Sequence, residues 1–277
     1  MECFLCTTCG TQYADSAAPP PHCAICEEER QYVGLEGQQW TTGTDLRQDH
    51  SNELIEWEPG VTAIRTQPSF AIGQRAFLIQ SPGGAILWDC VSLLDPDTIG
   101  AIHQRGGLKA IAISHPHYYT TMVEWMDAFD VPVFLHEADR QWVMRSDPRL
   151  VFWSGETKPL HDGLTLIRAG GHFAGGTVLH WPAGADGKGV LFSGDIIQVV
   201  PDRRWVSFMY SYPNLIPLSA SEVQRIAATV EPFQFDRIYG AFHPLQVDSD
   251  GKQAVRRSME RYVRALQGPT ASSPEKK

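Results

Sequence analysis

The sequence is short of positive charge. Its 277 residues include 23 lysines and arginines against 32 aspartates and glutamates, a net charge of −9. A nucleic-acid-binding surface needs clustered basic side chains that displace counterions from phosphates, and an anionic membrane attracts the same side chains. The charge balance therefore argues against both partners, and we expect a small-molecule substrate instead.

The sequence also lacks long apolar runs. None approaches the roughly 18 residues of a membrane-spanning helix. The N-terminal stretch MECFLCTTCG has neither the basic segment nor the long apolar segment of a signal peptide. We therefore expect a cytoplasmic, reducing location, where cysteines serve as thiols or metal ligands. Hydrophobic residues still make up 43% of the chain, enough for a sizeable core.

Cysteine is nearly absent after residue 26. Five of the six cysteines lie within residues 1–26, and only Cys90 follows. Two CxxC pairs, Cys6 with Cys9 and Cys23 with Cys26, are separated by 13 residues. The two residues between the cysteines of a pair let the backbone curl so that both thiolates face one ion. Two such pairs complete a tetrahedral site. One pair would leave a redox role open, but two predict a structural metal. Zinc is the default and iron the alternative.

These cysteines predict a zinc-ribbon or rubredoxin-like module over residues 1–40. Its charged residues are six acids and Arg30, a net charge of −5 that does not suit a nucleic-acid-binding ribbon. A module of about 40 residues has almost no core of its own. We therefore expect the metal to supply much of its folding energy.

Strands and helices alternate in both halves of the remaining chain, which predicts an α/β (α+β) domain over residues 44–266 with two mixed sheets between helices. The composition of residues 267–277 predicts a disordered tail. Apolar and β-branched runs predict strands over 61–66, 76–80, 85–90, 108–114, 131–136, 164–170, 177–182 and 189–195, and a strand running into a loop over 235–244. Periodicity and capping residues predict helices over 95–106, 120–129, 137–145, 219–231 and 251–266.

Four histidines and one aspartate follow predicted strands or lie between glycines. Loops beyond the carboxyl ends of strands are where α/β folds bind ligands, and glycines let the backbone approach an ion closely. The residues are His115 and His117 after LKAIAIS, His172 in AGGHFAGG, Asp195 after VLFSG, and His243 after RIYGAF. The other histidines lie in ordinary contexts and are interpreted as structural.

Taken in order, LWDC, SHPHYYTT, GGHFAGGT, FSGD and GAFHP resemble the motifs of the metallo-β-lactamase superfamily over about residues 55–266. The resemblance implies an αββα sandwich with a metal site at one edge of the sheets. It implies that His115, His117 and His172 hold one metal, with Asp195 as a bridge or fourth ligand. It also implies that Asp89 supports the metal loop by a hydrogen bond.

The family's HxHxDH motif is degenerate here, because HPHYYT places Tyr119 and Thr120 where ligands of a second metal stand. Only Asp195 and His243 remain for that metal, and two ligands, one of them shared, are too few to hold an ion firmly. A phenol with a pKa of about 10 is a poor ligand at neutral pH. We therefore predict one active-site metal, zinc by default with iron as the alternative. A weakly bound second ion stays an alternative.

The leading hypothesis is a zinc-dependent hydrolase that activates water against an ester, thioester, lactone, amide or phosphoester. Asp195 or His243 is the candidate group for moving the water's proton, and Tyr118 or Tyr119 is a candidate donor to an oxyanion. One alternative is a mononuclear iron oxygenase similar to persulfide dioxygenases, with His115, His172 and Asp195 as ligands. Another is a catalytically silent binding protein. Residues 205–214, rich in aromatics, form either a substrate wall or a core loop.

Overall fold

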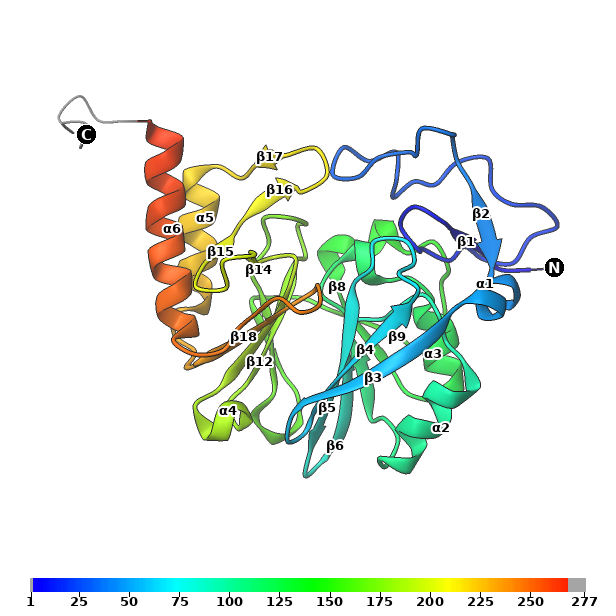
Figure 1. The fold of residues 1–277 in the computed structure, drawn as a ribbon, viewed down its shortest axis with the longest axis horizontal. Coiled ribbons are helices and arrows are strands. Elements are labelled where there is room, and N and C mark those ends of the chain that lie inside the picture. Colours follow the sequence, from blue (N-terminus) through cyan, green and yellow to red (C-terminus); the bar gives the residue numbers. More distant parts are fainter. Residues whose placement is uncertain (1, 269–277) are drawn as a thin grey trace.

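The computed structural model describes residues 2–268, which form an N-terminal ribbon and two large sheets flanked by helices (Figure 1). The predicted two mixed sheets between helices are confirmed. Residues 269–277 of the expected tail lie outside the described residues. No helix within residues 2–268 has the length and apolar character needed to cross a bilayer.

The first large sheet has seven strands in sequential order. Its first four strands are antiparallel neighbours, and the third and fourth form a hairpin around SPGG in which Ser81 pairs with Gly84. The last four strands run parallel, joined through helices. The strands are β3 (Ser51–Glu58), β4 (Val61–Gln67), β5 (Arg75–Ser81), β6 (Gly84–Trp88), β7 (Ala110–Ala112), β8 (Val133–His136) and β9 (Leu150–Trp153).

The second large sheet has six strands in the order β10-β11-β12-β13-β18-β19. Its one parallel pair joins β13 to β18, so the chain leaves both of these strands at the same edge. The strands are β10 (Thr157–Pro159), β11 (Thr165–Arg168), β12 (Thr177–Trp181), β13 (Val190–Gly194), β18 (Arg237–Gly240) and β19 (Gln246–Val247). Two small hairpins, β14 (Gln198–Val199) with β15 (Val206–Ser207) and β16 (Met209–Ser211) with β17 (Ile216–Pro217), precede β18.

Helices cover the outer face of each sheet, so apolar side chains form three buried layers. The layer between the sheets contains Phe77, Trp88, Phe192 and Tyr239. In Figure 1 α5 and α6 lie on one side of the molecule and α2 and α3 on the other. The helices are α1 (Gly43–Asp49), α2 (Pro96–Gln104), α3 (Met122–Phe129), α4 (Gly184–Gly187), α5 (Ala220–Val230) and α6 (Gly251–Gln267), with 3₁₀ turns η1 (Pro116–Tyr118), η2 (Glu137–Trp142) and η3 (His161–Gly163).

The N-terminal ribbon is closed by one antiparallel pair, β1 (Phe4–Cys6) with β2 (Trp40–Thr42). The pairing carries the ribbon two residues past the expected boundary at residue 40. Its four buried cysteines cluster with Ile25 against Tyr13 and Trp40, a core of very few side chains. The ribbon therefore depends on its cysteines rather than on apolar packing.

Local structure differs from the sequence-based expectation in several segments. Residues 51–58 form edge strand β3, which its polar sequence SNELIEWE did not predict. Helix α1, strands β9 and β10 and the two small hairpins were not predicted either. The helix expected over 137–145 is the shorter 3₁₀ turn η2. The strand expected to run into a loop over 235–244 does so after Gly240.

Arg75 joins the two large sheets at the edge where this loop lies. Its buried guanidinium donates to the carbonyl oxygens of Gly240 at 3.0 Å and Leu245 at 2.7 Å. The side chain also lies over the rings of Phe77 and Trp57. Burial lowers the pKa of Arg75 to about 9, so it stays charged at neutral pH.

Replacing Arg75 by alanine should destabilise the fold, because two buried carbonyl groups would lose a charged donor. We expect the free energy of unfolding to fall by about 3 kcal/mol in equilibrium urea denaturation. Arg65→Ala is the matched control, since Arg65 forms a partly exposed ion pair with Glu53, and its loss should cost less than about 1 kcal/mol. Equal effects of the two substitutions would contradict the role of Arg75.

Candidate metal centre

Three histidines and one aspartate meet where the two large sheets approach each other. His115 and His117 follow β7, His172 lies in the loop between β11 and β12, and Asp195 follows β13. One nitrogen of each imidazole and one carboxylate oxygen lie within 4.8 Å of one another, and all four side chains are buried. We call His115, His117, His172 and Asp195 the histidine cluster.

Two donor–donor distances in the histidine cluster are close to those around a tetrahedral ion. Bonds of about 2.0–2.1 Å to nitrogen or oxygen place neighbouring donors about 3.4 Å apart. His172 Nε2 lies 3.3 Å from His117 Nδ1, and His115 Nε2 lies 3.9 Å from Asp195 Oδ2. Among residues 2–268, His115 Nε2 and Asp195 Oδ1 have no hydrogen-bond partner although both are buried. A cation between them would satisfy both atoms.

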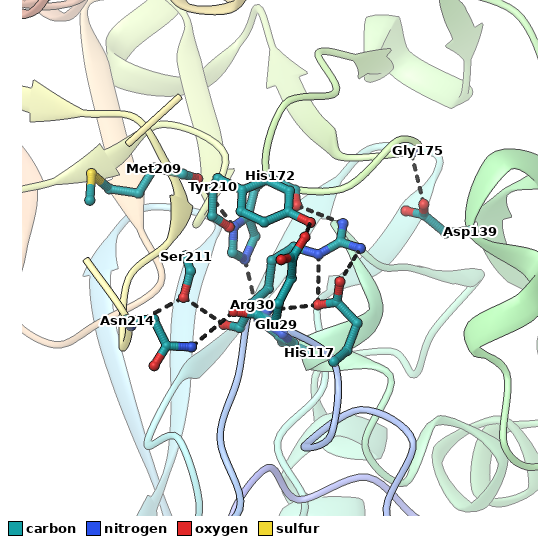
Figure 2. A network of polar contacts seen from close by, with 11 residues as sticks. Glu29, Arg30, His117, Asp139, His172, Gly175, Met209, Tyr210, Ser211 and Asn214 are labelled. Carbon is teal, nitrogen blue, oxygen red and sulfur yellow. Dashed lines mark hydrogen bonds and ion pairs between the residues drawn. The ribbon is translucent and has the colours of Figure 1, made fainter. Parts of the chain in front are cut away.

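Backbone carbonyls hold the ring of His172 in its ligand orientation (Figure 2). His172 Nδ1 lies 2.8 Å from the carbonyl oxygen of Tyr210 and 3.2 Å from that of Met209. Because a carbonyl oxygen only accepts, Nδ1 carries the proton and Nε2 is left with a free lone pair. The segment over residues 205–214 therefore orients a candidate ligand.

Asp89 and Ser114 orient His115 in the same manner. The carboxylate of Asp89 accepts the backbone N–H of Ser114 at 2.7 Å, and the Ser114 hydroxyl lies 2.8 Å from His115 Nδ1. The contact directs His115 Nε2 into the pocket. Gly194, at φ +51, makes room for Ser114, since a Cβ there would lie 2.7 Å from its hydroxyl. Asp89 thus supports the loop through Ser114.

Burial sets the protonation of the histidine cluster. It lowers the pKa of His115 and His117 well below the usual range and that of His172 to about 4, so these rings are neutral near pH 7. Neutral imidazole is the form that binds metals. Burial also raises the pKa of Asp195 to about 7. A bound cation would favour the charged carboxylate.

Of the two candidate tyrosines, Tyr118 is the one beside Asp195. The 3₁₀ turn η1 brings its ring to 4.4 Å from that of His115, measured between centroids. Its hydroxyl faces Asp195 and opposes the rise of that carboxyl's pKa, although no hydrogen bond of good geometry joins them. Both tyrosines pack in the apolar core cluster.

The remaining positions of the degenerate motif and His243 lie outside the histidine cluster. The Thr120 hydroxyl points to the carbonyl oxygen of Val91 at 3.4 Å. His243 lies against Trp57 of β3, with ring centroids 5.5 Å apart. Among residues 2–268, the group that converges on one point beside the sheets comprises three histidines and Asp195. The structure therefore does not assemble ligands for a second ion there.

The four cysteines of the two CxxC pairs form a second candidate site. We call Cys6, Cys9, Cys23 and Cys26 the cysteine cluster. Cys6 and Cys26 Sγ atoms lie 3.5 Å apart, and those of Cys9 and Cys23 lie 3.6 Å apart. Zinc–sulfur bonds of about 2.3 Å place tetrahedral neighbours about 3.8 Å apart. The spacing and burial fit one tetrahedral ion.

The ribbon lies directly over the histidine cluster. Arg30 donates from Nη1 to the carbonyl oxygen of His172 at 3.0 Å (Figure 2). Its guanidinium lies 4.0 Å from the centroid of the Phe173 ring. At the other end of the ribbon, the backbone N–H of Gln12 donates to the carbonyl oxygen of Thr120 at 3.1 Å.

Two residues near the site, Asp139 and Arg30, were missed by sequence reasoning. Asp139 of η2 accepts the backbone N–H of Gly175 at 2.8 Å and so holds the loop of His172. No local motif marks Asp139, because its partner lies 36 positions away. Arg30 did carry a signal, as the single basic residue of an acidic module.

Removing the hydroxyl that orients His115 should weaken metal binding without unfolding the chain. For Ser114→Ala we expect the dissociation constant of the ion in the histidine cluster to rise about 10-fold, measured by competition with a chelator of known affinity. Ser258→Ala is the matched control, because this buried serine of α6 contacts Val206 instead. A Ser114→Ala chain with unchanged affinity would contradict the role of the hydroxyl.

Comparisons with known proteins place the chain by sequence and by fold. No protein-family model matches the sequence. The chain is 53% identical over 268 residues to the uncharacterized protein YmaE of Bacillus subtilis (strain 168), covering 96% of this chain and 97% of YmaE.

Solved structures with this fold include two metallo-β-lactamases. The DIM-1 metallo-β-lactamase matches 76% of this chain and 97% of its own at a TM-score of 0.58 and 14% identity. A HARLDQ-motif mutant of the Cronobacter sakazakii enzyme matches 77% and 93% at a TM-score of 0.51 and 17% identity. At such identities the likeness shows the fold alone. The chain therefore belongs to the same family as YmaE, and its two-sheet domain has the metallo-β-lactamase fold.

Proposed function

We propose that the chain is a metal-dependent hydrolase of a small-molecule substrate, with one zinc ion held by the histidine cluster. The observation that carries the proposal is the convergence of three buried imidazole nitrogens and one carboxylate oxygen within 4.8 Å. His115 and His172 are oriented by contacts at their outer nitrogens, so their inner nitrogens face the pocket. Such oriented histidines are typical of metal sites.

A single ion in the histidine cluster is supported by the positions of the other candidate ligands. Tyr119 lies in the apolar core and His243 lies beside Trp57. Three imidazoles suit a catalytic zinc ion, which keeps its fourth position for water with Asp195 beside it, whereas mononuclear iron oxygenases use two histidines and one carboxylate with open positions. The nitrogen of His117 therefore favours zinc over iron. We propose zinc for the cysteine cluster as well.

The residues around the pocket suit hydrolysis. When bound, zinc lowers the pKa of a coordinated water toward about 7 and polarises a carbonyl or phosphoryl oxygen. Asp195, whose carboxylate lies beside the imidazole nitrogens, is placed to accept a proton from water and return it to a leaving group. The Tyr118 hydroxyl, beside Asp195, is the candidate hydrogen-bond donor to developing negative charge. Suitable substrates are esters, thioesters, lactones, amides or phosphoesters.

Metal analysis tests the two sites directly. Protein purified from cells grown with zinc and iron available should contain two metal ions per chain, one in each cluster. His115→Ala should lose one ion, and Cys6→Ala the other, because each removes a ligand. His180→Ala is the matched control, since this buried histidine contacts the carbonyl oxygen of Gln234 instead. Three tightly bound ions, or no loss in His115→Ala, would contradict one ion in the histidine cluster.

Turnover separates hydrolysis from oxygen chemistry. A zinc-loaded chain should cleave at least one member of a panel of chromogenic esters, thioesters, lactones and phosphoesters without oxygen. Asp195→Asn should lower kcat on that substrate by about 100-fold, because the proton acceptor is lost. Oxygen-dependent turnover of a persulfide by an iron-loaded chain, with no hydrolysis, would favour the oxygenase instead.

A further inference from the structure

The segment that follows the cysteine cluster is fixed to it by short backbone contacts. Only three residues separate the candidate ligand Cys26 from Arg30. The backbone N–H groups of Cys26 and Glu27 both donate to the carbonyl oxygen of Cys23, and that of Gln31 donates to Glu28. Whatever holds the cysteines together therefore also sets the position of Arg30.

Glu28 holds Arg30 in one orientation. The carboxylate of Glu28 accepts Arg30 Nε at 2.8 Å, Nη2 at 2.7 Å and the Arg30 backbone N–H at 2.8 Å. Both side chains are about one-seventh exposed or less. When a carboxylate binds one edge of a planar guanidinium, the remaining N–H groups point in a fixed direction. In this structure that direction leads to the loop of His172.

Arg30 contacts the loop of His172 by hydrogen bonding and by stacking. Nη1 donates to the His172 carbonyl oxygen at 3.0 Å, and the guanidinium lies 4.0 Å from the centroid of the Phe173 ring and 5.0 Å from that of Tyr210. Figure 2 shows Arg30 beneath Tyr210 and against His172. Arginine over an aromatic ring in a poorly hydrated position is favourable. Arg30 thus restrains a candidate ligand through its backbone.

The residues beside Arg30 hold the strand that orients the same histidine. Ser211 donates from its hydroxyl to the Arg30 carbonyl oxygen at 3.1 Å. Asn214 donates from Nδ2 to the carbonyl oxygens of Glu29 and Gln31, each at 2.9 Å (Figure 2). These contacts fasten the ribbon to the hairpin whose carbonyl groups accept the Nδ1 proton of His172. Both restraints on His172 therefore pass through residues 29–31.

We propose that Arg30 is a positioning residue that couples the cysteine cluster to the histidine cluster, so that an ion held by the four cysteines keeps His172 in its ligand orientation. The proposal rests on the proposed function only in requiring a metal at His172. Coupling between two binding sites is reciprocal. An ion at either cluster then strengthens binding at the other.

The rate of metal loss tests this coupling without any substrate. Protein fully loaded with zinc is mixed with a zinc-binding dye. Because His115→Ala holds zinc only in the cysteine cluster, its release rate is subtracted to give the rate for the histidine cluster. Arg30→Ala should release zinc from the histidine cluster at least about 10-fold faster than the unmodified chain. Arg30→Lys should release it at an intermediate rate, because an ammonium keeps the charge but cannot contact Glu28 and the carbonyl group together.

Arg261→Ala is the matched control. Arg261 also lies over an aromatic ring, 3.7 Å from the centroid of Trp205, but on α6, so zinc release should match the unmodified chain. Should Arg30→Ala fold poorly, Glu28→Gln keeps the side-chain shape, removes the charge that grips Arg30, and should accelerate release in the same direction. Circular dichroism and retained zinc in the cysteine cluster establish folding.

The outcomes separate this proposal from the proposed function. Wild-type release rates in folded Arg30→Ala or Glu28→Gln would overturn the coupling and leave the hydrolase proposal standing. Faster release in both variants, with no hydrolysis of any substrate by the loaded chain, would support the coupling and refute the hydrolase. An unmodified chain that binds no metal at His172 would overturn both.

Discussion

Three imidazole rings and one carboxylate are buried together where the two sheets meet, and the arrangement around them follows from the cost of that burial. A buried charge without a partner is costly, and so is a buried polar atom without a hydrogen bond. His115 Nε2 and Asp195 Oδ1 are such atoms within residues 2–268. One cation would satisfy both, which explains why a well-packed core keeps a polar pocket at its edge.

The supports of the histidine cluster come from segments far apart in the chain. His172 is held by Tyr210, 38 positions away, and by Arg30, 142 positions away, and its loop is held by Asp139. Such contacts form only once both sheets and the ribbon have come together. The geometry of the histidine cluster therefore depends on the complete fold, including the ribbon.

Much of the fold and the identity of the converging residues could be predicted from the sequence, partly from local patterns and partly from the resemblance of the ordered motifs to the metallo-β-lactamase superfamily. Two CxxC pairs, the HPH step and a histidine between glycines each have a physical reason for their spacing. The edge strand β3 was missed because one face of an edge strand meets solvent and its sequence is polar.

Side-chain direction could not be predicted in this way. The sequence left open whether Tyr118 or Tyr119 faces the site, and only the 3₁₀ turn η1 shows that Tyr118 lies beside His115. His243 follows its strand as expected, yet its ring lies against Trp57. Contacts across the sheets, such as those of Asp139 and Arg30, depend on tertiary packing that no local pattern encodes.

The loop at Thr120 serves two parts of the molecule at once. Its backbone, with Thr120 at φ +33, offers a carbonyl oxygen to Gln12 of the ribbon and leaves Tyr119 within the core. His115 and His117 of the histidine cluster lie a few residues earlier in the same loop. One short loop thus carries candidate ligands and the attachment point of the N-terminal ribbon, so a change in either is transmitted to the other through a few backbone bonds.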